Sequence, residues 1–169
     1  MPEIIITGWP AILLAFASSL LVTWYYIPKV IHIVRHRHLE DNPGKHKIHK
    51  NNIPTLGGIG IFAGFLVGYL LGIDGYMPGI SYFTAAAVML FFVGIKDDLV
   101  NINYTKKLLG EVASAIVVVL FTDIRFTSFH GFLGITDISA VNSYIVTLIV
   151  MVLIINAVNL IDGIDGLAA

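Results

Sequence analysis

The end of the chain carries the residues with the clearest capacity for chemistry. In an otherwise apolar run, Asn156, Asn159, Asp162 and Asp165 recur every three residues, and a glycine follows each of the two carboxylates. Ionisable groups at membrane depth are costly and usually line a site. Each three-residue step turns an ideal helix by about 60°, so neighbouring side chains share a face. We expect a helix end that unwinds at the glycines, with both carboxylates aimed at one ligand or cation. The alternative is a helix end capped by Asn and Asp.

A second acidic pair, Asp97 and Asp98, closes another apolar run. Carboxylates at a helix C-terminus oppose the macrodipole, so they need a reason to be there. They could act as a base or as magnesium ligands, because Mg²⁺ is often held by one or two carboxylates plus substrate phosphates. Adjacent helical residues point about 100° apart, which predicts different roles for the two. The alternative is structural: Asp98 caps the next helix and Asp97 pairs with Lys96.

Lysines follow this acidic pair. Lys106 and Lys107 open the next apolar run, and Glu111 lies four residues after Lys107. That spacing allows an ion pair between Lys107 and Glu111 within one helix.

A basic loop between the first two apolar runs holds most of the histidines. His32 and His36 are one helical turn apart, but a zinc site would need a further ligand. We expect instead an interfacial segment that faces anionic headgroups or a phosphate substrate. At the next helix start, Gly57 and Gly58 could let a phosphate approach backbone amides.

Composition places the chain in the membrane class. Of its 169 residues, 57% are hydrophobic and only 12% are charged, and the mean hydropathy is +0.86. A soluble domain would carry roughly twice that charge. The chain has no cysteine, which excludes disulfides and thiolate chemistry. The apolar N-terminus lacks a basic leading region and a small-residue cleavage site, so we expect it to remain as a membrane span.

The apolar runs predict an all-α, multi-pass transmembrane helix bundle of about five spans. They are continuous and not alternating, which favours helices over barrel strands. The third and fourth are shorter than the roughly 20 residues of a spanning helix, unless their flanks are also helical. The expected spans are about 11–34, 55–73, 81–95, 108–121 and 141–160.

The distribution of Lys and Arg predicts the orientation. Nine of the ten lie in or beside the loops at about 35–54 and 96–107, and only Arg125 lies in the segment at about 122–140. The positive-inside rule makes those two loops cytoplasmic and the third segment external. The N-terminus is then outside and the C-terminus, with its Asp residues, is cytoplasmic. The external segment partly alternates apolar and polar residues, which allows a short hairpin.

Glycines recur every four residues in the second run, at Gly60, Gly64, Gly68 and Gly72. Such a stripe of small residues is typical of close helix packing in membranes. We therefore expect this run to pack tightly against a neighbouring helix.

Three ordered motifs are similar to those of a known family. The motifs are Asp41-x-Pro43 with Lys47-Ile48-His49 and Pro54-x-x-Gly57-Gly58, then Asp97-Asp98, then Asn156-x-x-Asn159-x-x-Asp162-Gly163-x-Asp165-Gly166-Leu167. In these motifs the chain resembles the polyprenyl-phosphate N-acetylhexosamine-1-phosphate transferases, a group of integral membrane enzymes.

The resemblance implies a reaction in the bacterial plasma membrane. A UDP-activated N-acetylhexosamine gives its sugar-1-phosphate to polyprenyl (undecaprenyl) phosphate and UMP is released, with Mg²⁺ required and Mn²⁺ as a possible substitute. This step initiates cell-envelope glycan synthesis. The implied partners are the UDP-sugar, the lipid phosphate and the bilayer, with a homodimer possible and no nucleic acid.

The resemblance also implies roles for single residues. Asp97 and Asp98 are the implied catalytic residues, with Asp97 deprotonating the lipid phosphate. Asp98 and Asp162 resemble acids near the metal and the diphosphate. Lys50 and Lys107 resemble basic positions near the nucleotide phosphates. The full set of implied substrate-binding residues is Lys50, Thr55, Lys107, Asn156, Asn159 and Asp165.

The chain departs from the family at some points. His46 stands where the family often has Arg, and Glu111 stands where many members have Gln. Members are about twice as long, so we expect residues 1–169 to be the N-terminal half of one transferase domain, able to insert in a membrane but inactive alone. The loop pattern resembles the branch that uses UDP-N-acetylglucosamine more than the muramoyl-pentapeptide branch. From another class, a transporter or channel subunit is the rival; it predicts acids near the bilayer midplane.

Overall fold

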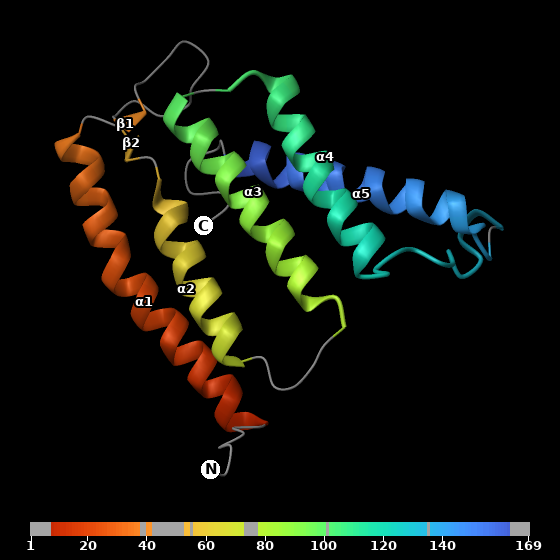
Figure 1. Ribbon diagram of the computed structural model, residues 1–169, viewed down its shortest axis with the longest axis horizontal. Coiled ribbons are helices and arrows are strands. Elements are labelled where there is room, and N and C mark those ends of the chain that lie inside the picture. Colours follow the sequence, from red (N-terminus) through yellow and green to blue (C-terminus); the bar gives the residue numbers. More distant parts are fainter. Residues whose placement is uncertain are drawn as a thin grey trace. The chain divides into compact units, whose positions relative to one another are not determined.

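The computed structural model contains helices in the order that the sequence predicts. It describes residues 8–37, 40–41, 53–54, 56–72, 78–100, 102–134 and 136–162. Within these ranges it has five α-helices, one short 3₁₀ helix and two two-residue strands (Figure 1). The elements are α1 (Trp9–His36), β1 (Glu40–Asp41), β2 (Ile53–Pro54), α2 (Gly57–Gly72), α3 (Ile80–Val100), α4 (Tyr104–Phe121), η1 (Phe132–Gly134) and α5 (Ala140–Asp162).

The five predicted helical runs are confirmed, and the two short ones are longer than their apolar cores. Helix α3 continues through its charged end to Val100, and α4 begins at Tyr104, before its lysines. Of the described helices, α1 and the Ala140–Leu160 part of α5 are long and apolar enough to cross a membrane, while α2 is apolar but shorter. The number of helices that cross a membrane and their orientation therefore stay predictions.

The chain forms two compact units, Met1–Tyr76 and Met77–Ala169. In the first unit, α1 and α2 lie side by side (Figure 1). The predicted glycine stripe forms their contact, and Gly60, Gly64 and Gly68 are buried. A Cβ added to Gly64 would lie 1.9 Å from Thr23 Oγ1 and 2.8 Å from the Ser19 carbonyl oxygen. The helices approach so closely that only glycine fits between them.

We expect Gly64→Leu to destabilise the contact of α1 with α2. A bulky side chain there must push two backbones apart, and overpacking of this kind costs about 1–3 kcal/mol or more. The measurement is the thermal unfolding midpoint of the purified protein in detergent. Gly58→Leu is the matched control in the same helix, because no described atom lies within 4 Å of a Cβ at Gly58. Equal midpoints for both variants would contradict a packing role for the stripe.

A two-residue antiparallel ladder, which the sequence did not predict, closes the basic loop. Glu40 pairs with Pro54 and Asp41 with Ile53, and β2 also contacts α1. The ladder brings the start of the first motif, at Asp41, next to the segment that leads into α2. The residues between the strands, 42–52, lie outside the described part of the chain.

In the second unit, α4 contacts both α3 and α5. Its buried residues recur at the spacing of one helix face and are Glu111, Ser114, Ala115, Val118 and Val119. A Cβ added to Gly110 would lie 2.5 Å from Val93 Cγ2, so α4 approaches α3 closely at that level. Asn103 caps the start of α4, since its Oδ1 accepts the Thr105 N–H at 3.3 Å. The expectation that Asp98 provides this cap is wrong.

The segment between α4 and α5 forms the short hairpin that the sequence allowed. Ser128 and Asp137 make an antiparallel bridge, and the Phe129 N–H donates to the Thr136 carbonyl at 2.9 Å. Two glycines at its tip, Gly131 and Gly134, have positive φ values of 85° and 75°. Backbone of this kind favours glycine, which explains both breaks in the pattern.

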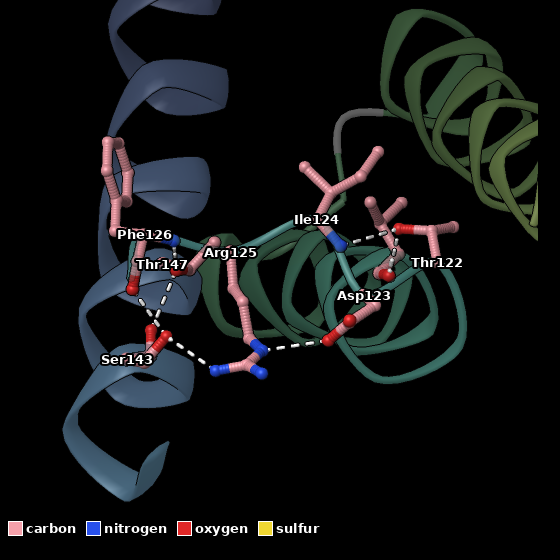
Figure 2. Close-up of polar contacts among 8 residues, drawn as sticks. Thr122, Asp123, Ile124, Arg125, Phe126, Ser143 and Thr147 are labelled. Carbon is pink, nitrogen blue, oxygen red and sulfur yellow. Dashed lines mark hydrogen bonds and ion pairs between the residues drawn. The ribbon is translucent and has the colours of Figure 1, made fainter. Parts of the chain in front are cut away.

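Hydrogen bonds fasten this segment to the first turns of α5 (Figure 2). The Phe126 N–H donates to Thr147 Oγ1 at 2.9 Å, and Ser143 Oγ donates to the Phe126 carbonyl. The Arg125 guanidinium donates to Asp123 Oδ1 at 2.8 Å and to Ser143 Oγ at 3.4 Å. Its bond to the Asp123 carboxylate raises the pKa of Arg125. These contacts give partners to the buried hydroxyls of Ser143 and Thr147 and hold the segment against α5, which is a structural role.

Candidate active site

The two acids of α3 lie in different surroundings, as their adjacent positions predict. Both fall within the last four residues of the helix. Asp97 is partly buried and faces α4, whereas Asp98 is exposed. The two carboxylates therefore differ in exposure to solvent.

Asp97 makes an ion pair with Lys107 of α4. The distance from Lys107 Nζ to Asp97 Oδ2 is 2.6 Å, and the two side chains are 16% and 25% exposed. A charge-assisted bond of this length, partly shielded from water, restrains the carboxylate more than a surface pair does. The structure therefore brings together two sequence-predicted site residues from different helices. The pairings expected as structural alternatives, Asp97 with Lys96 and Lys107 with Glu111, are both wrong.

Glu111 instead contacts α5. Its carboxylate, 2% exposed, accepts from Asn156 Nδ2 at 2.6 Å. The same nitrogen donates to the Val152 carbonyl oxygen at 2.9 Å. Asn156 was expected in the site, whereas Glu111 was considered as a helix ion-pair partner and as a departure from the family, and not as a site residue. The available signal was its place on the apolar face of α4, where a carboxylate needs a partner.

The polar residues of the last motif are still on a regular helix. Asn156 and Asn159 lie within α5, and the helix continues through Asp162. The Asn159 side chain is exposed. The expected unwinding therefore does not begin before Gly163. The stretch from Gly163, with Asp165, lies outside the described residues, as do Lys50, Thr55 and the side chain of Asp162.

No group of three or more His, Asp or Glu side chains gathers within the described part of the chain. His32 and His36 do stack, with ring centroids 4.3 Å apart. Among the described residues this pair has no third ligand, which a zinc site would need. A magnesium site needs fewer protein ligands, because one or two carboxylates together with substrate phosphates can bind Mg²⁺. Asp98 offers oxygen ligands of the right type, whereas the Lys107 ammonium on Asp97 would compete with a cation there.

The described acids of the two motifs lie at helix ends. Asp97 and Asp98 are in the last turn of α3, and Asp162 is the last residue of α5. An ion pathway would place them near the middle of the helices. These positions favour a site at helix ends over an ion pathway through the middle of the helices.

Comparison with known proteins identifies the family. The family model described as glycosyl transferase family 4 matches residues 80–169, which contain α3, α4 and α5. The chain belongs to this family. The resemblance to polyprenyl-phosphate N-acetylhexosamine-1-phosphate transferases is thereby confirmed.

Curated relatives come from two branches. A phospho-N-acetylmuramoyl-pentapeptide-transferase of Corynebacterium efficiens is 30% identical over 148 residues, covering 78% of this chain and 39% of that protein. An undecaprenyl-phosphate alpha-N-acetylglucosaminyl 1-phosphate transferase of Escherichia coli is 33% identical over 90 residues, covering 53% of this chain and 24% of that protein. The chain thus spans less than half the length of these relatives. No solved structure matches it.

Proposed function

We propose that the protein transfers N-acetylhexosamine-1-phosphate from a UDP-sugar to polyprenyl phosphate at the cytoplasmic face of the bacterial plasma membrane. The observation that carries the proposal is the Asp97–Lys107 pair, which joins two expected site residues within the family-matched segment. It places an anion that can take a proton beside a cation that can hold a phosphate. Phosphoryl transfer needs this combination of positioning and charge neutralisation more than covalent help.

The proposed chemistry assigns a task to each group. Asp97 accepts the proton of the lipid phosphate, whose oxygen then attacks the β-phosphorus of the UDP-sugar. The bond between that phosphorus and the bridging oxygen breaks, and UMP leaves. The Lys107 ammonium has three donors, so it can hold Asp97 and a phosphate oxygen together. Asp98 and Asp162 would hold Mg²⁺, which would neutralise charge at the diphosphate.

We propose UDP-N-acetylglucosamine as the donor. Support comes from the similarity of the Asp41-x-Pro43 and Lys47-x-His49 pattern to that branch and from the relative in E. coli. The second candidate donor is UDP-N-acetylmuramoyl-pentapeptide. It is favoured by the longer alignment, over 148 residues, with the corynebacterial relative.

The test is a transfer assay with the full-length protein in membranes of a host that lacks its own enzyme. Radiolabelled UDP-N-acetylglucosamine and UDP-N-acetylmuramoyl-pentapeptide are supplied separately with undecaprenyl phosphate. We expect label from the first donor in the lipid fraction, with an equal amount of UMP released. Label from the second donor alone would select the other branch. Absence of transfer from both donors would contradict the proposed function.

A further inference from the structure

The contact between Glu111 and Asn156 assigns a task to a residue outside the motifs. Glu111 lies on the buried face of α4, one helical turn after Lys107. Lys107 holds Asp97 of α3 at 2.6 Å, and Glu111 holds Asn156 of α5 at the same distance. One turn of α4 therefore contacts both Asn156, the first residue of the last motif, and Asp97, the proposed general base.

The partners of Asn156 fix the orientation of its carboxamide. The Val152 carbonyl oxygen can only accept, and a carboxylate of Glu111 likewise accepts. Both hydrogens of Nδ2 therefore have partners within the protein. Only Oδ1 remains for a ligand, so Asn156 can accept a hydrogen bond or bind a cation but cannot donate to a phosphate oxygen.

We propose that Glu111 is a positioning residue for the transfer reaction. It holds Asn156 with its oxygen available and sets the register of α5 against α4, and so the place of Asn159 and Asp162. The class of substrate group that Asn156 takes is then an N–H or O–H donor, such as an amide or a sugar hydroxyl. This inference rests on the proposed function, because it concerns the same site.

The pair offers an exchange of donor and acceptor as a test. Glu111→Gln keeps an acceptor oxygen for Asn156, whereas Glu111→Ala removes it. Asn156→Asp would set two carboxylates against each other, because like charges resist sharing a site. In the double variant Glu111→Gln/Asn156→Asp, the new amide donates to the new carboxylate. That variant restores the bond between α4 and α5 with its direction reversed and keeps an oxygen on α5 for the substrate. It does not restore the bond to the Val152 carbonyl, because a carboxylate cannot donate.

The measurement is kcat and donor KM for each variant of the full-length protein, on folded and monodisperse samples. We expect Glu111→Ala to lower kcat by ~10- to 10²-fold, as for a misplaced reacting group, and Glu111→Gln to keep most of the turnover. We expect Asn156→Asp to lower kcat by ~10-fold or more and the double variant to recover part of that loss, because it regains the bond between residues 111 and 156 but not the bond to Val152. Ser114→Ala is the control: among the described residues, this buried hydroxyl of α4 bonds only to the Gly110 carbonyl of its own helix.

The outcomes separate the two hypotheses. A wild-type protein that transfers no sugar-1-phosphate would overturn the proposed function, and the positioning role with it. With an active wild type, full turnover in Glu111→Ala would overturn the positioning role alone. So would a double variant no better than Asn156→Asp. Recovery in the double variant, with Ser114→Ala unchanged, would support it.

Discussion

Turnover of the full-length enzyme is expected to fall by ~10²-fold or more when Asp97 is replaced by Asn, the loss expected for a general base. The amide cannot take a proton from the lipid phosphate. It keeps an oxygen that accepts from Lys107 Nζ, now 2.6 Å from the carboxylate, so the contact of α3 with α4 should survive. Expression and thermal stability should therefore change little. The measurement is kcat on purified protein with saturating donor and lipid phosphate.

Asp123→Asn provides the matched control for that experiment. Asp123 also makes an ion pair, with Arg125 at 2.8 Å, but in the segment between α4 and α5. If loss of any paired carboxylate disturbed the protein generally, both variants would lose turnover. We expect the loss only for Asp97→Asn. Near-normal turnover in that variant would reduce the Asp97–Lys107 pair to a structural contact between two helices.

The helices could be predicted because membrane helices satisfy their backbone hydrogen bonds internally. Continuous apolar runs therefore identified all five. The ends of the helices were harder to predict, because charged residues follow the apolar core without ending the helix. Helix α3 continues past Asp97 and Asp98 to Val100, and α4 is capped by Asn103. Hydropathy detects only the apolar part of a helix, whereas the cap decides where the helix begins.

The partners of the site residues depended on packing that the sequence does not display. Lys107 could reach Glu111 in its own helix or an acid in another. The close approach of α4 to α3 at Gly110 and Val93 determines which acid Lys107 contacts. The two helices are antiparallel, so this approach places Lys107 level with Asp97. Glu111 lies on the buried side of α4, where its carboxylate accepts a hydrogen bond from Asn156.

The second large effect is expected at Lys107. We expect Lys107→Gln to lower kcat/KM for the UDP-sugar by ~10² to 10⁴-fold, since each charge-assisted bond contributes about 1.5–3 kcal/mol and 1.4 kcal/mol is a factor of ten. Two such bonds are involved. One is the observed bond to Asp97, and the other is the proposed bond to a donor phosphate. The measurement is kcat and donor KM of the purified full-length protein, which together register the loss of both bonds.

The kinetic constants separate the two bonds. Loss of phosphate binding raises the donor KM, whereas loss of the hold on Asp97 lowers kcat. If the two residues act as a pair, the double variant Lys107→Gln/Asp97→Asn should lose less kcat/KM than the product of the two single losses. The effects of mutating residues in contact are not additive. Lys106→Gln is the matched control: Lys106 is the neighbouring exposed cation, turned about 100° away around α4. If Lys107→Gln leaves the donor KM unchanged, the role of Lys107 is limited to positioning Asp97. If both lysine variants lose kcat/KM equally, net positive charge attracts the donor and the geometry of the pair does not.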